Sequence, residues 1–328
     1  MIRLAIVVPC YNEEKALPVT VRRLGQLLAD LAGAGKIAAT SGVWLIDDGS
    51  ADGTWTLIRE TAGKDPRFHG VKLSRNRGHQ NALLAGLDAA EGDAIVTIDA
   101  DLQDDTSVIE KMVDLNAAGI DIVYGVRRSR TADSAFKRAT AESYYRILGF
   151  MGVQIVFNHA DYRLMSRRAI AALERFTEVN LFLRGIVPQL GFATATVAYD
   201  RHERTAGESK YPVRRMISLA IDGITSFSVV PLRMIAAVGI MVCLFSVAAI
   251  SWVLYGKIFR GDVLPGWASS VIPIYLLGGV QLFSIGVIGE YVGKIYLETK
   301  RRPRFFIEER ADGAEDQAGL DASRQNSL

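Results

Sequence analysis

The stretch Ala94-Ile-Val-Thr-Ile-Asp99-Ala-Asp101-Leu-Gln103 joins an apolar, β-branched run to two carboxylates one residue apart. Such a run is typical of a buried strand, and two carboxylates so close together cannot both enter a core. Asp99 and Asp101 therefore mark a turn at a strand end. Their oxygens suit a hard divalent cation, Mg²⁺ or Mn²⁺, which would neutralise charge on a departing nucleotide. The alternative is an ordinary acidic turn.

Similar β-branched runs precede and follow this stretch, and helical patterns separate them. This alternation is the signature of an α/β fold with a mostly parallel, Rossmann-like sheet and helices on both faces, whose ligands bind beyond the carboxyl ends of the strands. The predicted strands are Ala5–Pro9, Val43–Asp47, Val71–Ser74, Ala94–Asp99 and Asp121–Tyr124, and the predicted helices are Leu17–Ala32, Thr54–Ala62, Gln80–Ala90 and Thr106–Ala118.

Two other predicted strands end in polar turns, Pro9-Cys-Tyr11-Asn12-Glu13-Glu14 and Asp47-Asp48-Gly49-Ser50. If these turns share one sheet edge with Asp99 and Asp101, they frame a nucleotide. Tyr11 is placed to stack on a base, and a carboxylate from Glu13 or Asp47 can accept hydrogen bonds from ribose hydroxyls or from the base.

Two long uncharged runs, Met234–Tyr255 and Val263–Gly289, lie late in the chain. Each meets the roughly 20 residues that a membrane-spanning helix needs. Buried core helices are the alternative, but these runs lack a charged face. Basic residues flank the pair on both sides, at Arg214, Arg215 and Arg233 before it and at Lys294, Lys300, Arg301, Arg302 and Arg304 after it. The pattern predicts a membrane-spanning hairpin with both flanks in the cytoplasm and the segment near Arg260 outside.

The 328-residue chain has a net charge of only +2, which does not indicate nucleic-acid binding. Its two cysteines, Cys10 and Cys243, suggest no disulfide framework. The four histidines have no metal-ligand spacing, so a zinc site is not predicted.

The pattern divides the chain into a catalytic domain at 1–212, an interfacial helix at 213–228, the membrane hairpin at 229–292, and a basic segment with a disordered tail at 293–328. Phe136–Met151 and Val213–Phe227 mix basic and apolar residues, which suits either the membrane surface or ordinary helix packing. Glu308–Leu328 is polar and predicts disorder.

A polar connection ahead of the apolar runs holds Arg201, Arg204 and Lys210. Cations there would meet the phosphate of a lipid. The alternative is a solvated basic loop attracted to the anionic membrane surface.

These motifs occur together with several others along nearly the whole chain. They are Val8-Pro-Cys-Tyr-Asn-Glu13, Asp47-Asp-Gly-Ser50, Ser74-Arg-Asn-Arg-Gly-His-Gln80, Asp99-Ala-Asp-Leu-Gln103, Tyr162-Arg-Leu164, Gly207-Glu-Ser-Lys-Tyr211, Gly289-Glu-Tyr-Val-Gly-Lys-Ile-Tyr296 and Arg302-Pro303. The combination resembles family 2 glycosyltransferases of the GT-A fold, in the branch of the dolichol-phosphate mannose synthases and bacterial polyprenyl-phosphate (bactoprenol) glucosyltransferases.

The resemblance assigns roles to individual positions. It implies nucleotide-sugar contacts at Pro9, Tyr11, Glu13, Asp47, Ala100 and Asp101, a metal and diphosphate cluster at Asp99, Asp101 and Gln103, and phosphate contacts at Arg127, Arg204 and Lys210. Arg201 is added to the acceptor-phosphate contacts by its place in the same polar connection. It also makes Asp161 a catalytic candidate, with orientation of Arg163 or of the acceptor as the alternative role.

The implied enzyme inverts configuration as it moves a hexose, first of all glucose from UDP-glucose, onto undecaprenyl or another polyprenyl phosphate. Mannose and an aminosugar are alternative donors, and a homotetramer is the implied assembly. Processive polysaccharide synthases share the fold but carry a Gln-x-x-Arg-Trp motif, which this chain lacks. A non-catalytic nucleotide-binding membrane scaffold is the alternative from another class, and the intact Asp99 and Asp101 argue against it.

Overall fold

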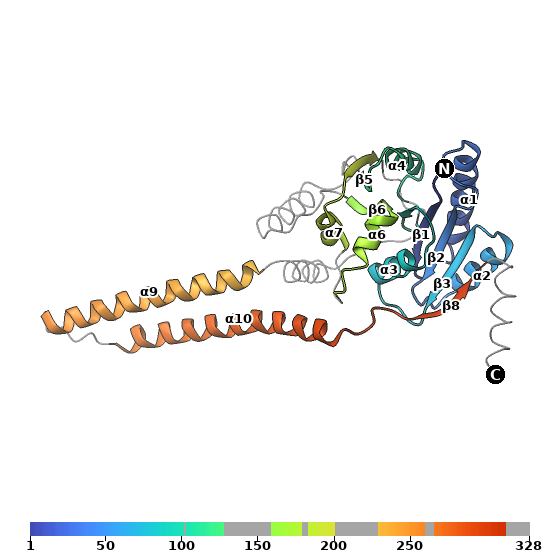
Figure 1. Ribbon diagram of the computed structural model, residues 1–328. Coiled ribbons are helices and arrows are strands. Elements are labelled where there is room, and N and C mark those ends of the chain that lie inside the picture. Colours follow the sequence, from blue (N-terminus) through green and yellow to red (C-terminus); the bar gives the residue numbers. More distant parts are fainter. Residues whose placement is uncertain (102, 128–158, 179–182, 201–228, 260–265, 313–328) are drawn as a thin grey trace. The chain divides into compact units, whose positions relative to one another are not determined.

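The computed structural model describes residues 1–101, 103–127, 159–178, 183–200, 229–259 and 266–312 (Figure 1). These residues belong to two compact units. The first holds the described residues up to 200 and those from 302 onward, and the second holds 229–259 and 266–301.

The first unit is built on an eight-stranded sheet with the order β7-β5-β6-β4-β1-β2-β3-β8. β1 pairs in parallel with β2 and β4, β2 with β3, and β5 with β7, whereas β6 and β8 run antiparallel to their neighbours. The sheet is therefore mostly parallel, as the sequence predicts. The strands are β1 Leu4–Cys10, β2 Gly42–Asp47, β3 Phe68–Leu73, β4 Ala94–Thr97, β5 Ile122–Arg127, β6 His159–Ser166, β7 Thr194–Tyr199 and β8 Ile307–Ala311.

Helices connect and cover these strands. Every residue of β1 is buried, which explains its continuous apolar run. The helix α3 packs so closely on the sheet that a Cβ at Gly86 would lie 2.3 Å from Cγ1 of Val7. The helices of this unit are α1 Leu17–Gly33, α2 Thr54–Lys64, α3 His79–Ala89, α4 Val108–Ala117, α6 Arg167–Leu173 and α7 Leu183–Ile186, followed by the 3₁₀ helix η1 Val187–Leu190.

All five predicted strands are present, with bounds that differ by a few residues, and the four predicted helices are confirmed as α1 to α4. The sequence pattern missed β6 and β7. β6 carries Asp161 and Arg163, two charged residues that read as a surface segment, yet both are buried and paired with each other. A buried ion pair conceals a central strand from a hydrophobicity pattern.

The predicted disorder from Glu308 onward is wrong for its first residues, because residues 307–311 form β8 on the edge of the sheet beside β3. Side chains secure this strand: the indole Nε1 of Trp55 donates to Glu309 Oε2 at 3.0 Å, and Lys72 pairs with Glu308 at 3.1 Å. The polar sequence of β8 suits an exposed edge, where one face meets water.

The second unit contains two long helices in contact with each other, α9 Val230–Phe259 and α10 Trp267–Lys300 (Figure 1). Their large apolar side chains face outward, and Phe245 and Leu282 are 75% and 73% exposed. Val230–Ala248 and Leu276–Lys300 are long and apolar enough to cross a membrane. Such exposure is costly in water and favourable in lipid, so this unit is suited to association with a membrane.

Candidate active site

The parallel neighbours β4, β1 and β2 bring their carboxyl ends to one edge of the sheet. Cys10, the last residue of β1, pairs in register with Asp47, the last residue of β2. Pro9 lies within β1, and Tyr11 follows it with its ring half exposed. Asp99 and Asp101 follow β4, the neighbour of β1 on the other side. The predicted strand-end residues therefore lie along one edge.

The loops after β1 and β2 are fastened to each other. Asn12, whose φ is +56°, donates its backbone N–H to Ser50 Oγ at 2.9 Å, and its side-chain Oδ1 accepts from Ala51 N at 2.9 Å. The backbone N–H of Glu13 donates to Thr54 Oγ1 at 2.8 Å. These hydrogen bonds hold the backbone on both sides of Tyr11, where a planar base could stack.

Asp47 is a buried carboxylate with unused hydrogen-bonding capacity. Its Oδ1 accepts from Ser50 N at 3.2 Å, whereas Oδ2 is buried and has no hydrogen-bond partner among the described residues. Burial raises the pKa of Asp47 despite the hydrogen bonds from Ser50. Because an unpaired buried acceptor is costly, Oδ2 is suited to receive an N–H or O–H group from a ligand such as a nucleoside.

Asp48 organises the next loop along this edge. Its two carboxylate oxygens accept from the backbone N–H groups of Arg77 and Gly78, at 2.7 and 2.8 Å. The neighbouring Gly49 has φ +68°, and a Cβ there would lie 2.6 Å from the backbone of Arg75 and Asn76. A larger residue would push the loop away. The segment that leads into α3 at His79 is thereby held against the end of β2.

Asp99 and Asp101 form the acidic end of β4. Packing around the Asp99 carboxyl raises its pKa to about 6, and the charges of Asp161, Asp104 and Asp101 add to the rise while His79 opposes it. Among the described residues no three His, Cys, Asp or Glu side chains form a ready metal cluster. Two carboxylates plus the amide of Gln103 are nevertheless hard oxygen donors, and phosphate oxygens of a ligand can complete such a set. The residues present fit a divalent cation.

Hydrogen bonds within the turn and from α1 hold the rest of this turn in place. Gln103 donates its backbone N–H to Asp101 Oδ1 at 3.2 Å. Ala100 is buried, and its carbonyl accepts from Thr20 Oγ1 on α1 at 2.6 Å. These two hydrogen bonds hold the backbone of Ala100 and Gln103 on either side of Asp101.

Asp161 lies at the start of β6, on the same edge, and two arginines and a histidine surround it. Arg163 Nη2 donates to Oδ1 at 2.8 Å, and Arg184 Nη2 donates to Oδ2 at 2.9 Å. His79 Nε2 lies 3.5 Å from Asp161 Oδ2 and 3.6 Å from Asp99 Oδ1, so it stands between the two acidic groups.

The pKa values follow from this geometry. Burial alone would raise the pKa of Asp161, but His79, Arg184 and Arg163 hold it well below the usual range. Burial would lower the pKa of His79, yet the net effect of Asp161 and Asp99 is to raise it. A carboxylate with so low a pKa is a weak proton acceptor at neutral pH.

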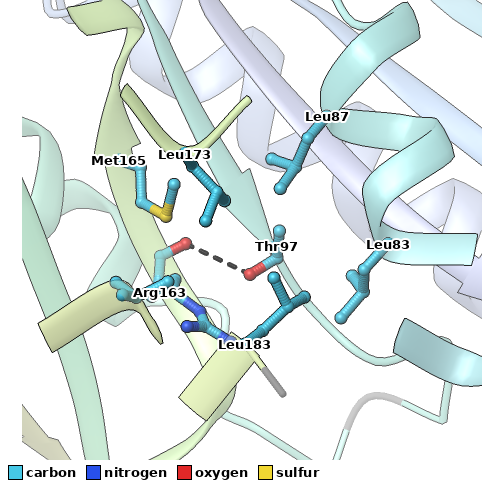
Figure 2. A pocket seen from close by; sticks show the side chains of 8 residues that line it. Leu83, Leu87, Thr97, Arg163, Met165, Leu173 and Leu183 are labelled. Atoms are coloured by element: carbon cyan, nitrogen blue, oxygen red, sulfur yellow. Dashed lines mark hydrogen bonds between the residues drawn. The ribbon is translucent and has the colours of Figure 1, made fainter. Parts of the chain in front are cut away.

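A small cavity of about 10 Å³ lies beside Arg163, between β4, β6, α3 and α7 (Figure 2). Its other lining residues are apolar except Thr97, whose Oγ1 hydrogen-bonds the backbone carbonyl of Asp161. Arg163 Nη1 is buried with no hydrogen-bond partner among the described residues. A cavity of this size admits at most one water molecule. This cavity is therefore too small to hold a substrate.

Arg127, an expected phosphate contact, ends β5 at this edge. Its guanidinium bonds Asp104 Oδ1 and the hydroxyl of Tyr199, each at 3.2 Å, and Tyr199 also donates to Asp104. Asp104 is buried one residue after Gln103, so this triad fixes the end of the acidic turn. Of the other expected phosphate contacts, Arg201, Arg204 and Lys210 lie outside the described residues, as do the two segments expected to be interfacial.

Sequence reasoning missed His79, Arg184 and Asp104 as site residues. His79 had a usable signal, since it follows a strand and opens a helix at the predicted ligand edge. Arg184 had none, because it lies in a four-residue helix far along the chain.

Comparison with known sequences shows the family of proteins to which this chain belongs. Residues 5–173 match the family described as Glycosyl transferase family 2. An uncharacterized glycosyltransferase of Bacillus subtilis, YkoT, is 48% identical over 93% of this chain and 91% of its own length. The bactoprenol glucosyl transferase of Shigella phage SfX is 40% identical over 94% of this chain and 99% of its own.

The chain belongs to glycosyl transferase family 2 and is a glycosyltransferase. A solved structure, the mannosyltransferase PcManGT from Pyrobaculum calidifontis in complex with GDP-Man and Mn2+, is 17% identical with a TM-score of 0.44, and the match covers 90% of this chain and 85% of that one.

Proposed function

We propose that this protein transfers a hexose, with glucose from UDP-glucose as the first choice, to undecaprenyl or another polyprenyl phosphate at the cytoplasmic face of the bacterial inner membrane. The observation that carries the proposal is that Asp99 and Asp101 share one sheet edge with Asp47, whose buried Oδ2 has no hydrogen-bond partner among the described residues. The chain is also 40% identical to a bactoprenol glucosyl transferase over nearly its whole length. The outward-facing apolar helices α9 and α10 suit a lipid acceptor.

In the proposed reaction, an oxygen of the lipid phosphate attacks the anomeric carbon of the donor, and the bond to the nucleoside diphosphate breaks with inversion. Asp47 and Tyr11 would hold the nucleoside. Asp99, Asp101 and Gln103 would hold Mg²⁺ or Mn²⁺, which supplies positive charge against the leaving diphosphate when bound. Positioning and electrostatics carry most of the rate enhancement.

This reaction needs little help from a base. A phosphate monoester has a second pKa near about 6, so it is largely dianionic at neutral pH and already nucleophilic. The low pKa of Asp161 agrees with that requirement, because a group that remains ionised can organise cations without accepting a proton. We therefore assign Asp161 an orienting role.

The direct test incubates membranes containing the protein with undecaprenyl phosphate and a panel of labelled nucleotide sugars: UDP-glucose, UDP-galactose, GDP-mannose and an aminosugar nucleotide. Transfer of label to an organic-extractable lipid is expected, most strongly from UDP-glucose. Failure of every donor to label the lipid would refute the proposed acceptor.

The membrane orientation has its own test. Both helices should span, which leaves the connection between them outside and both termini in the cytoplasm. A Gly261→Cys variant should react with an impermeant thiol reagent added from outside. Labelling from the cytoplasmic side alone would overturn this topology.

The basic connection after β7 should bind the lipid phosphate. Arg204→Ala removes a charge-assisted hydrogen bond worth roughly 1.5–3 kcal/mol, so acceptor efficiency should fall about tenfold to a hundredfold. Nucleotide-sugar binding measured without acceptor should change much less. An equal fall in donor affinity would mean that Arg204 contacts the diphosphate or supports the fold.

A further inference from the structure

Arg184 is the second residue of α7, and its position is fixed from two directions. The backbone N–H of its neighbour Leu183 donates to Gln80 Oε1 on α3 at 3.2 Å. Its own guanidinium donates to Asp161 twice, from Nη2 to Oδ2 at 2.9 Å and from Nε to Oδ1 at 3.3 Å. A guanidinium that donates two hydrogen bonds to one carboxylate has a defined plane and direction.

The two arginines that contact Asp161 differ in exposure. The side chain of Arg163 is 2% exposed, whereas that of Arg184 is 41% exposed. Arg163 alone balances the charge of the nearly buried Asp161. Arg184 adds a second guanidinium to the same carboxylate, with far more of its side chain exposed.

Stability does not explain the second arginine. An ion pair with a partner exposed this far contributes little to the free energy of unfolding. The buried Arg163–Asp161 pair already meets the requirement that a buried charge be paired. Arg184 lies at the same edge of the sheet as the acidic turn, one side chain away from Asp99 through His79.

We propose that Arg184 binds a phosphate oxygen of a substrate, and that Asp161 is the positioning residue that holds the Arg184 guanidinium toward it. The ligand chemistry is a phosphate oxyanion, which arginine recognises through its planar set of donors. Two substrates of the proposed function carry such a group at this edge, the diphosphate of the nucleotide sugar and the phosphate of the lipid. The inference rests on the proposed function for the choice between these two sources.

The test uses the full-length protein purified in detergent, with two titrations on each variant. One follows binding of UDP-glucose with Mn²⁺ and no acceptor, and the other varies undecaprenyl phosphate at saturating donor. Arg184→Gln should lower donor affinity or acceptor kcat/KM about tenfold to a hundredfold, and whichever falls identifies the phosphate source. Arg184→Lys keeps the charge without the planar fork and should lose less.

Arg168→Gln is the matched control. Arg168 forms a similar two-donor pair with a buried carboxylate, that of Asp121, but at the opposite end of β6. It should leave both titrations within threefold of the parent. Asp161→Asn should lower whichever of donor affinity and acceptor kcat/KM falls in Arg184→Gln. The double variant should lose no more of that quantity than the more damaging single variant, because both changes act on one contact.

Two results would overturn the inference. One is Arg184→Gln within threefold of the parent in both titrations. The other is an equal loss of kcat in Arg184→Gln and Arg184→Lys with unchanged affinities, which would give Arg184 only a structural role. The proposed function fails separately: it fails if the parent transfers no sugar to the lipid, and the donor titration still reports on Arg184 in that case.

Discussion

Two acidic groups at one edge of the sheet have opposite surroundings. Asp99 lies among other carboxylates, and in the described part of the chain it has His79 at 3.6 Å but no arginine or lysine within ion-pairing distance. Asp161 is held by two guanidinium groups as well as by His79. The pKa of Asp99 is raised to about 6, whereas that of Asp161 lies well below its ordinary value.

The difference separates two tasks. Asp99 has other carboxylates nearby and no arginine or lysine partner among the described residues, so its charge is one that a metal ion would relieve. A carboxylate that is already neutralised has nothing to gain from a metal and serves to orient its cations. One edge of the sheet thus carries an acidic part suited to a metal and a cationic part suited to phosphate.

The largest expected effect is on catalysis at the acidic part. Asp99→Asn or Asp101→Asn should lower transfer by roughly a thousandfold or more, because metal stabilisation of a leaving diphosphate amounts to several kcal/mol. Chelation should reproduce the loss in the parent. Activity of the parent that persists in excess chelator would show that Asp99 and Asp101 do not act through a metal ion.

A large effect on stability is expected at the cationic part. Asp161→Ala leaves the buried Arg163 without its partner, which should lower the free energy of unfolding by about 3–5 kcal/mol. Asp99→Asn removes a charge from a crowded acidic cluster and should leave stability unchanged or higher. Denaturant unfolding in detergent measures both. Equal destabilisation by the two changes would show that the surroundings are not opposite.

The pH dependence should have opposite signs at the two carboxylates in metal-free protein. Because the folded pKa of Asp99 is about 6, above its ordinary 3.8, its contribution to stability should decline as pH rises from about 4 to 6. Asp161 has a lowered folded pKa, so its contribution should be complete above pH 3.8 and be lost as pH falls through the folded pKa.

The unfolding midpoint in EDTA, measured for the parent, Asp99→Asn and Asp161→Asn across this range, isolates each contribution. The difference between parent and Asp99→Asn should change between pH 4 and 6, and the difference between parent and Asp161→Asn should stay flat there. The same slope for both variants would contradict the assignment.

The smallest effect provides a baseline away from the site. Glu308→Gln removes the exposed pair with Lys72 that links β8 to β3. The free energy of unfolding should fall by less than about 1 kcal/mol, since exposed ion pairs contribute little. A larger loss would mean that β8 depends on this charge more than on its backbone pairing.

The sequence pattern indicates where the acidic residues lie in the fold but not which cationic residues lie beside them, for a physical reason. Asp99 and Asp101 follow directly from an apolar strand, so a local pattern contains both the fold and the chemistry. The cationic part is assembled from His79, Asp161, Arg163 and Arg184, which come from α3, β6 and α7. No local pattern indicates which distant side chains a fold brings together.

The strand β8 illustrates the same limit. Ile307-Glu-Glu-Arg-Ala311 has the composition of a flexible tail, and its stability as a strand comes from the unpaired edge of β3 and from Trp55. Strand preference depends strongly on such neighbours. A prediction from composition alone therefore places the tail in solvent.

The most direct test asks whether the metal binds at Asp99 rather than at Asp161. It measures Mn²⁺ binding to the purified protein by electron paramagnetic resonance, in the presence of a nucleoside diphosphate. With the nucleoside diphosphate saturating for each variant, the parent and Asp161→Asn should bind Mn²⁺ with similar affinity, whereas Asp99→Asn should lose at least tenfold, since a charged oxygen ligand is removed. Unchanged binding in Asp99→Asn, together with loss in Asp161→Asn, would place the metal at the other carboxylate and contradict the account.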